Sequence, residues 1–124
     1  MSDKSYTADE LTAHLAQFHC SDHLYRHWTG RLHFTDGVKE LADLAGAYWL
    51  IDAVASHQPD PLVRQEPFQL WVLSRRVGRQ FALEMNDGNT TRGILRQEIE
   101  YSDFPLDTIE LYLTDGVLML PGEY

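Results

Sequence analysis

Hydrophobic and polar residues recur with a helical period in the first half of the chain and with a strand period in the second half. The longest helical segment is Thr35–Gln58, where Val38, Leu41 and Trp49 fall on one face at about 100° per residue. Polar side chains are almost absent from residues 44–55, which is typical of a helix that is covered on all sides. We therefore predict one long, mostly buried helix at the centre of the fold.

The ends of the predicted helices are marked by capping residues and prolines. Asp36 can cap the long helix at its start, and Pro59 and Pro61 prevent its continuation. An earlier helix is predicted over residues 8–19, because Thr7 and Glu10 have the spacing of a capping box.

Short alternating runs predict the strands. Residues 24–28 and 31–34 are expected to form a hairpin that leads into the long helix. Further strands are predicted at residues 68–74, 80–85, 94–101, 109–113 and 117–120. The predicted fold class is α+β, in a single domain of residues 1–124: an N-terminal helix, a short hairpin, a long buried helix, then an antiparallel sheet of about five strands packed on that helix. No parallel sheet is expected, because βαβ alternation is absent.

Asp52 interrupts the apolar face of the long helix. A carboxylate in that position must be neutralised or must find a cationic or hydrogen-bonding partner. We expect Asp52 to be mostly buried and bonded to an Arg, a His, a Tyr or a backbone amide. It is either a structural acid or part of a polar pocket with Tyr48, His27 and His57, which could bind a small ligand or hydrolyse one.

The formal net charge is −9, and the acids are concentrated at the end of the chain. Residues 98–124 contain seven acids and no base. Binding to nucleic acid is not expected, because it needs clustered Lys and Arg. Strand alternation instead places Glu98, Glu100 and Glu110 on a surface that could meet a basic protein. The alternative is that the acidity only keeps the protein in solution.

One turn has the opposite charge. Arg75, Arg76 and Arg79 surround Gly78 between two predicted strands. Guanidinium groups bind anions with two parallel hydrogen bonds, so this turn is a candidate anion site. The other interpretation is a solvated hairpin tip.

Candidate metal ligands and nucleophiles are present without the spacing that their chemistry needs. His19, Cys20, His23 and His27 are close in sequence, but no CxxC or HExxH pattern accompanies them. Ser56 next to His57 does not lie in a nucleophile elbow, and no phosphate-binding glycine motif is present. We predict no metal and no cofactor, and we lean against an enzyme.

The only cysteine, Cys20, cannot form an internal disulfide, and no apolar leader or membrane-spanning stretch is recognisable. A reducing cytoplasm is therefore the expected compartment. A homodimer remains an alternative to a monomer.

Several short segments resemble an uncharacterised bacterial family, a domain of unknown function linked to phage and plasmid genes. The resemblance rests on Arg26-His27, Thr35–Val38, Gly46–Leu50, Asp52 and Ser56–Gln58, and covers residues 20–58 and 115–121. The family implies no activity, cofactor or catalytic residue. It favours a small accessory protein that inhibits or modulates a basic host protein by binding it.

Overall fold

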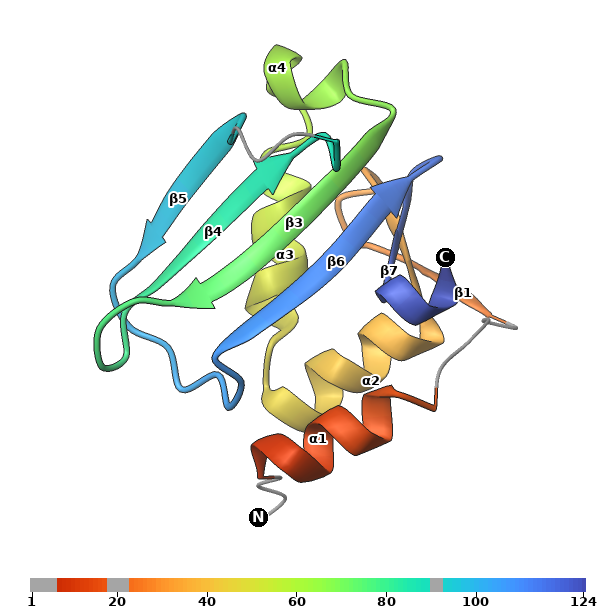
Figure 1. The fold of residues 1–124 in the computed structure, drawn as a ribbon. Coiled ribbons are helices and arrows are strands. Elements are labelled where there is room, and N and C mark those ends of the chain that lie inside the picture. The colour runs from red at the N-terminus through yellow and green to blue at the C-terminus, as the bar shows by residue number, and fades with distance from the viewer. Residues whose placement is uncertain (1–6, 18–22, 90–92) are drawn as a thin grey trace.

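The computed structural model describes residues 7–17, 23–89 and 93–124, which place helices on one side of a mixed sheet (Figure 1). The helices in this part of the chain are α1 Ala8–Leu15, α2 Asp36–Ala45, α3 Tyr48–Ser56, α4 Pro61–Arg64 and the 3-10 helix η1 Pro121–Glu123. The strands are β1 Leu24–Arg26, β2 His33–Thr35, β3 Phe68–Arg75, β4 Phe81–Asn86, β5 Leu95–Ile99, β6 Thr108–Thr114 and β7 Val117–Met119. The α+β class is confirmed. None of the described helices is both long and apolar enough to span a bilayer.

Within the described residues the sheet has seven strands in the order β1-β2-β7-β6-β3-β4-β5, and β2 runs parallel to β7. The five strands β3–β7 pair antiparallel as predicted, but the prediction is wrong in limiting the sheet to them and in expecting no parallel pair. The hairpin β1–β2 belongs to the same sheet, and it joins through a parallel pair in which His33 lies opposite Val117. A parallel pair needs a long connection. The segment between β2 and β7, which contains the helices and strands β3–β6, supplies this connection. No local sequence pattern reveals that β2 pairs with β7.

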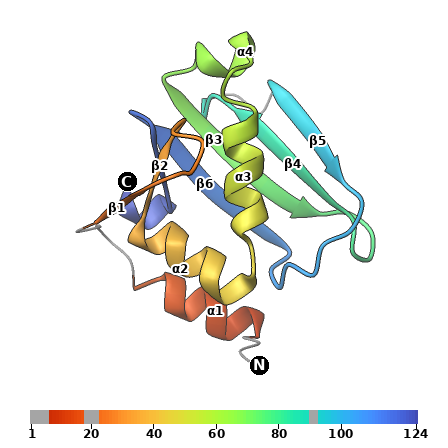
Figure 2. The same ribbon diagram turned by 180° about the vertical axis from the view of Figure 1, so that it is seen from behind.

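Helices α2 and α3 cover one face of the sheet, whereas no helix of the described residues covers the other face of β3, β4 and β6 (Figure 1 and Figure 2). Alternation along β3 separates the two faces. Trp71 and Leu73 are buried under the helices, while Leu70 and Val72 point to the other side and are half-buried. The main core therefore lies between the helices and one sheet face. It includes Leu41, Leu50, Val54, Trp71, Phe81, Leu83, Met85, Leu111 and Leu118.

The predicted long helix is two helices, because the chain turns at Gly46. Gly46 has φ 62° and ψ 39°, a left-handed conformation in which L side chains are strained. Its N–H and that of Ala47 both bond to the carbonyl of Ala42, which satisfies the end of α2. The prediction of one continuous helix is therefore wrong.

The break at Gly46 also changes which side of α3 is buried. Leu50 and Val54 face the core, whereas Tyr48, Asp52 and Ser56 form an exposed stripe at intervals of four residues. A helical wheel drawn through residues 38–53 assumes one axis, so it places Asp52 on the wrong face. The expectation that residues 44–55 are covered on all sides is corrected in the same way.

The start of α2 is held by the residue that precedes it, Thr35, and by Glu123 near the C-terminal end of the sequence. Thr35, and not Asp36 as predicted, caps the helix by accepting a bond from the Val38 N–H. Glu123 accepts bonds from the Thr35 hydroxyl at 2.7 Å and from the Gly37 N–H at 3.2 Å. A carboxylate at this position also complements the helix dipole. A Cβ on Gly37 would lie 2.6 Å from Glu123 Oε1, so only glycine permits this approach.

Local sequence patterns predicted the remaining elements well. The Thr7–Glu10 capping box is confirmed at the start of α1, and the strand segments are found within a few residues of their predicted bounds. No element is predicted between Pro59 and residue 68, but this segment contains α4, which Asp60 caps through the Leu62 N–H. Pro61 suits the first turn of this short helix, because an N–H at that position would have no acceptor within the helix and proline has none to satisfy.

Candidate functional site

His27 and Asp52 form the tightest polar contact among the predicted site residues. His27 is 5% exposed, and its Nε2 lies 2.7 Å from Asp52 Oδ1. Its Nδ1 lies 2.8 Å from Thr29 Oγ1 and 3.2 Å from the Thr29 backbone nitrogen. Because a backbone N–H can only donate, Nδ1 is the acceptor, and the Nε2 hydrogen is donated to Asp52. The surroundings therefore fix the tautomer of this ring.

Asp52 has a partner of the expected kind, but the expected burial is wrong. Its side chain is 51% exposed, and the exposed Trp28 indole also donates to Oδ1, at 3.1 Å. Both nitrogens of His27 are engaged, and the Thr29 hydroxyl accepts the Arg31 N–H at 3.3 Å. Neither nitrogen of His27 is therefore free to act as a base, whereas only Oδ1 of the Asp52 carboxylate accepts these bonds. The cluster fastens the turn between β1 and β2 to α3.

Tyr48 and His57 do not join this cluster. The Tyr48 hydroxyl donates to Asp43 on α2, and burial together with that bond raises the pKa of Tyr48. His57 lies 2.7 Å from the Gln97 side-chain oxygen on β5, and its ring stacks on Trp71 at 5.9 Å. The four residues of the predicted polar pocket thus have three separate sets of partners.

The three arginines of the β3–β4 turn do not converge on one site. The Arg75 guanidinium donates to Asp107, to the Gly78 carbonyl and to the Phe104 carbonyl, at 2.9, 2.9 and 3.1 Å. It also lies 4.8 Å from the centre of the Phe81 ring. Arg79 lies over the ring of Tyr101, at 5.7 Å, and Arg76 is exposed. Arg75 therefore has a structural role.

Only part of the histidine and cysteine cluster considered as candidate metal ligands lies within the described residues. His19 and Cys20 lie outside the described residues. His23 is exposed and lies 3.7 Å from Asp36, whereas His27 is bonded to Asp52. Within the described residues, no group of three or more His, Cys, Asp or Glu could hold a metal ion.

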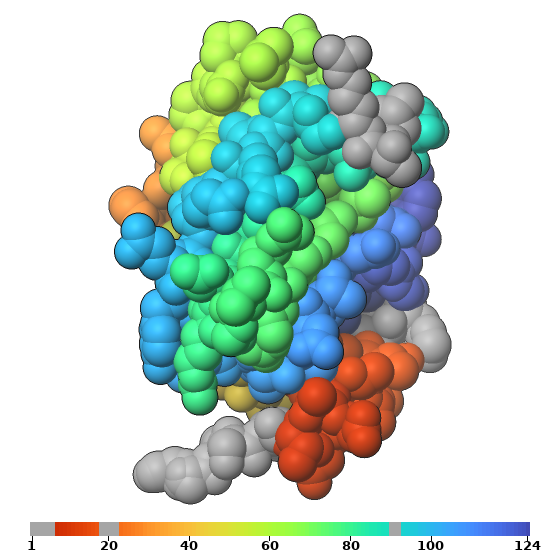
Figure 3. All heavy atoms as spheres, turned by 60° about the vertical axis from the view of Figure 1, so that its left-hand side comes forward, coloured from red at the N-terminus to blue at the C-terminus, as the bar shows by residue number. Residues whose placement is uncertain are grey.

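The face of the sheet without helices is a more extensive candidate, and we call it the open face. Figure 3 shows β5, β4, β3 and β6 side by side on the molecular surface. The open face is formed by the outward residues Phe68, Leu70, Val72, Ser74, Ala82, Glu84, Asn86, Arg96, Glu98, Thr108, Glu110 and Tyr112. Phe68, Leu70, Val72 and Tyr112 are half-buried and lie outside the main core.

Carboxylates surround this apolar strip. Glu110 lies opposite Val72 in the register and makes no ion pair with any residue that the structure describes. Glu84 and Glu98 both bond to Arg96, at 3.0 and 2.6 Å, and these carboxylates raise the pKa of the guanidinium. Arg96 thus offsets part of the negative charge of this face. Glu100 is exposed just beyond the end of β5.

An aromatic corner lies at one end of the open face. Phe68, Tyr112 and Tyr124 contact one another with ring centres 5.1–5.4 Å apart, and Tyr124 is 72% exposed. Asp87 and Gly88 complete a pocket of about 410 Å³ around these rings. The sequence contains a signal for the apolar strip of the open face, because residues 70–73 are apolar on both faces of one strand.

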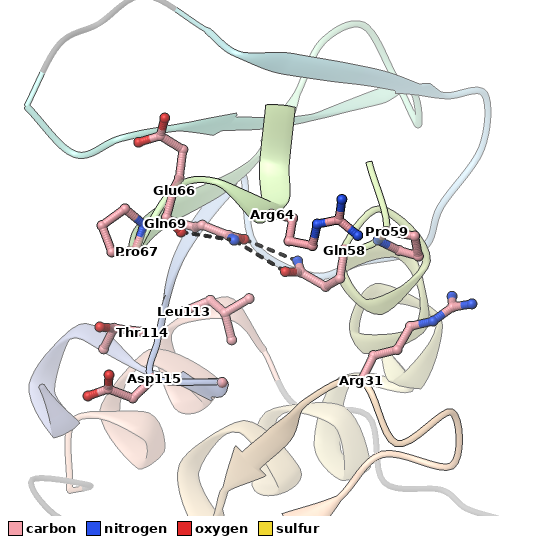
Figure 4. Close-up of a pocket in the computed structure, with 11 residues that line it drawn as sticks. Arg31, Gln58, Pro59, Arg64, Glu66, Pro67, Gln69, Leu113, Thr114 and Asp115 are labelled. Atoms are coloured by element: carbon pink, nitrogen blue, oxygen red, sulfur yellow. Dashed lines mark hydrogen bonds between the residues drawn. The ribbon is translucent and has the colours of Figure 1, made fainter. Parts of the chain in front are cut away.

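A larger pocket, of about 550 Å³, lies between the end of α3, α4 and the β6–β7 turn (Figure 4). Its lining includes the charged residues Arg31, Arg64, Glu66 and Asp115, none of which was predicted as a site residue. The Gln58 and Gln69 side chains exchange hydrogen bonds at 3.1 and 3.2 Å within it. These residues come from separate elements, so sequence spacing gives no sign of the pocket.

Comparisons with known proteins identify the family only. The chain belongs to a family of unknown function, DUF6876, whose model matches residues 9–124. This confirms the resemblance to an uncharacterised domain and extends it over nearly the whole chain. No curated protein and no solved structure matches.

Proposed function

We propose that this protein acts by binding another protein, and that the open face is the surface it uses. The observation that carries the proposal is the half-buried apolar strip of Phe68, Leu70, Val72 and Tyr112 on a sheet face without a helix. Contiguous apolar surface with a polar border is typical of interaction sites. The main core does not explain this strip, because the core lies on the other face.

The charges on this face favour a basic partner. Glu84, Glu98 and Glu110 outnumber Arg96, and the whole chain has a net charge of −9. A basic surface would be attracted from a distance, which mainly raises the association rate. A second copy of this chain would instead bring like charges together. We therefore favour a different protein over a homodimer.

The aromatic corner gives the partner a place to bury a cationic side chain. The rings of Phe68, Tyr112 and Tyr124 offer π faces to an Arg or Lys, and Asp87 lines the same pocket. Aromatic residues are also enriched among the few interface residues that dominate binding energy. The resemblance to a family linked to phage and plasmid genes adds a narrower proposal. The basic partner would then be a host protein that this chain inhibits or modulates.

Photocrosslinking in source cells tests the surface directly. A photoreactive phenylalanine analogue replaces Val72 in the open face, and a control protein carries the same analogue at Ser56, which is exposed on α3. We expect a crosslinked partner only from position 72, attached through a segment rich in Lys and Arg. Crosslinks only between two copies of the chain, or equally from both positions, would contradict the proposal.

Once the partner is known, charge reversal tests how the open face acts. Glu98→Lys with Glu110→Lys should slow association about tenfold at low salt, because electrostatic steering is lost. Asp103→Lys makes the same kind of change beside Trp49 of α3, on the side of the sheet that the helices cover. Stopped-flow mixing at increasing salt measures both variants, and an association rate indifferent to salt and to the reversals excludes this mechanism. Glu100→Lys then shows whether the charge beyond β5 contributes.

A further inference from the structure

The first half of β6 is paired on one side only. β3 pairs with β6 along its whole length, from Thr108 to Thr114, whereas β7 pairs only with residues 112–114. On the side away from β3, Figure 1 shows no strand of the described residues beside the start of β6. Residues 108–111 therefore form a free strand edge inside a larger sheet.

The backbone groups of Thr108 and Glu110 point to this free edge. The Arg75 N–H donates to the Asp107 carbonyl at 2.7 Å, so Asp107 directs its backbone groups toward β3. Because neighbouring residues of a strand direct these groups to opposite sides, Thr108 and Glu110 direct theirs away from β3. Both residues are exposed, and their N–H and carbonyl groups bond to no residue that the structure describes. Such groups can pair with a further strand.

Pro121 explains why β7 does not cover this edge. β7 pairs with β6 as far as Met119, and two residues further the same register would put Pro121 opposite Glu110. Proline has no N–H to donate to the ladder. The chain turns instead into η1, which begins at Pro121. The place beside the start of β6 is therefore left open by the sequence of this chain.

An apolar pocket of about 390 Å³ adjoins the free edge. Its apolar lining consists of Leu15, Ala16, Leu106, Ile109, Leu120 and Pro121. Ile109 alternates with the outward residues Thr108 and Glu110, so its side chain is on the helix side of the sheet. A residue that paired with Ile109 from an added strand would share that side, and its side chain would enter the pocket.

We propose that an extended segment of the partner protein adds to the sheet as a strand beside residues 108–110. The segment alternates apolar and basic residues. An apolar side chain enters the pocket beside Ile109, and its neighbours point to the open face, where the Glu110 carboxylate favours Lys or Arg. This inference rests on the proposed function for the basic character of the partner, and it adds the form in which the partner is recognised.

Synthetic heptapeptides in which Lys alternates with Val, Ile, Leu or Phe are the probe. At least one of the four should bind the full chain saturably below about 1 mM in fluorescence anisotropy at about 0.15 M salt. A control peptide of the same composition, with the alternation broken, carries the same charge. It should bind at least about tenfold more weakly, because it cannot place its apolar residues on one side.

Methylation of the peptide backbone tests whether the segment binds as a strand. Alternate residues of a strand direct their N–H groups to opposite edges, so only one set of residues can donate to β6. Methyl groups on the nitrogens of one set should abolish binding, whereas methyl groups on the other set should be tolerated. Loss with the Lys set indicates antiparallel pairing, and loss with the apolar set indicates parallel pairing.

Amide hydrogen exchange locates the bound segment. The N–H groups of Thr108 and Glu110 should gain protection when the peptide binds, because each acquires an acceptor. The outer edge of β5, residues 95–99, is the internal comparison, because it is also a free edge of the sheet within the described residues. Its amides should exchange as in the free protein.

Variants test the pocket and the charge separately. Thr12→Trp fills the pocket from α1 and should raise the dissociation constant of the peptide at least about tenfold. Ala13→Trp is the matched control, since Ala13 is an exposed neighbour on α1 outside the pocket lining. Glu110→Gln keeps the backbone N–H and should weaken binding about threefold more than Glu100→Gln. Urea midpoints verify the fold, and Ala16→Phe replaces Thr12→Trp if the midpoint falls.

Three results would overturn the inference. One is the absence of saturable binding of any of the four peptides up to about 1 mM. Another is binding on which the two methylation patterns have the same effect, and the third is protection at β5 in place of β6. A basic partner crosslinked at position 72 would leave the proposed function standing in each case. Strand addition without that crosslink would instead exclude the open face and keep this edge.

Discussion

Trp71 and Val72 are neighbours in β3, yet they lie on opposite faces of the sheet and have different surroundings. Trp71 is 1% exposed, stacks on His57 and donates its indole N–H to Gln69. Val72 is half-buried on the open face, between Glu84 and Glu110 in the register. The face that carries Trp71 is apolar because it forms part of the main core. The second face is apolar without a layer to cover it, which is why we assign it to binding.

The largest expected effect of a substitution is on the covered face. Trp71→Ala should lower the free energy of unfolding by about 3–5 kcal/mol, because it empties a close-packed site and leaves Gln69 without one of its donors. Val72→Ala should lower it by about 1 kcal/mol or less, in line with the range of strand preferences. Urea unfolding followed by circular dichroism measures both. Equal losses would remove the distinction between the two faces.

A smaller loss is expected in the helix layer at Asp52. Asp52→Ala leaves the buried Nε2 hydrogen of His27 without its acceptor, which costs about 1–3 kcal/mol. Asp52→Asn keeps an oxygen at that position and should cost less. A loss in the range of a deeply buried ion pair is not expected, because half of the Asp52 side chain is exposed. Urea unfolding midpoints at neutral pH test this prediction. Equal midpoints for Asp52→Ala and the parent would show that the His27–Asp52 bond does not stabilise the β1–β2 hairpin.

A substitution on the open face should change the rate of association with the partner and hardly change the free energy of unfolding. Arg96→Gln breaks two exposed ion pairs, with Glu84 and Glu98, and solvent screening leaves such pairs little effect on stability. The same change makes the face more negative, so association with a basic partner should become faster and more sensitive to salt. Stopped-flow binding and urea unfolding of one protein preparation test both statements. A slower association would show that Arg96 itself contacts the partner.

The smallest effect concerns alkaline pH. The pKa of Tyr48 is raised in the folded state by burial and by its bond to Asp43, so the unfolded chain releases this proton first as pH rises. The stability that Tyr48 contributes is complete below its unfolded pKa, about 10, and is lost as pH rises through the folded value. Tyr48→Phe should therefore lose less stability than the parent between about pH 9 and 11. Urea midpoints across that range provide the comparison.

Periodicity and turn chemistry in the sequence were sufficient for the local elements. The alternation of Phe81, Leu83 and Met85 predicted β4, and the Asp115-Gly116 pair, with φ 54° and 74°, predicted the turn before β7. The same rules also contain the signal for the helix break at Gly46, since glycine after a helical run is a usual helix end. Apolar residues on both sides of Gly46 outweighed that signal in the prediction.

The candidate sites depended on contacts that sequence spacing does not encode. His27 and Asp52 were both selected as site residues, but their pairing follows from how the β1–β2 turn packs on α3. Arg31 and Arg64 line one pocket because the β1–β2 turn and α4 border it. To predict either contact from the sequence, one must know the order of the strands in the sheet, which depends on the β2–β7 pair. Charge patterning was more informative, because strand alternation alone placed Glu98 and Glu110 on one face.

The β2–β7 pair has a consequence for how the chain folds over time. The hairpin of residues 24–35 and the start of α2 are anchored by residues 117–123, through the strand pair and through Glu123. During synthesis the first third of the chain must therefore wait for the last residues before it can complete its core. Contacts between such distant residues raise the contact order, which is associated with folding in milliseconds to seconds. Until that closure, the apolar face of α2 lacks part of its cover, and such exposed apolar surface favours aggregation.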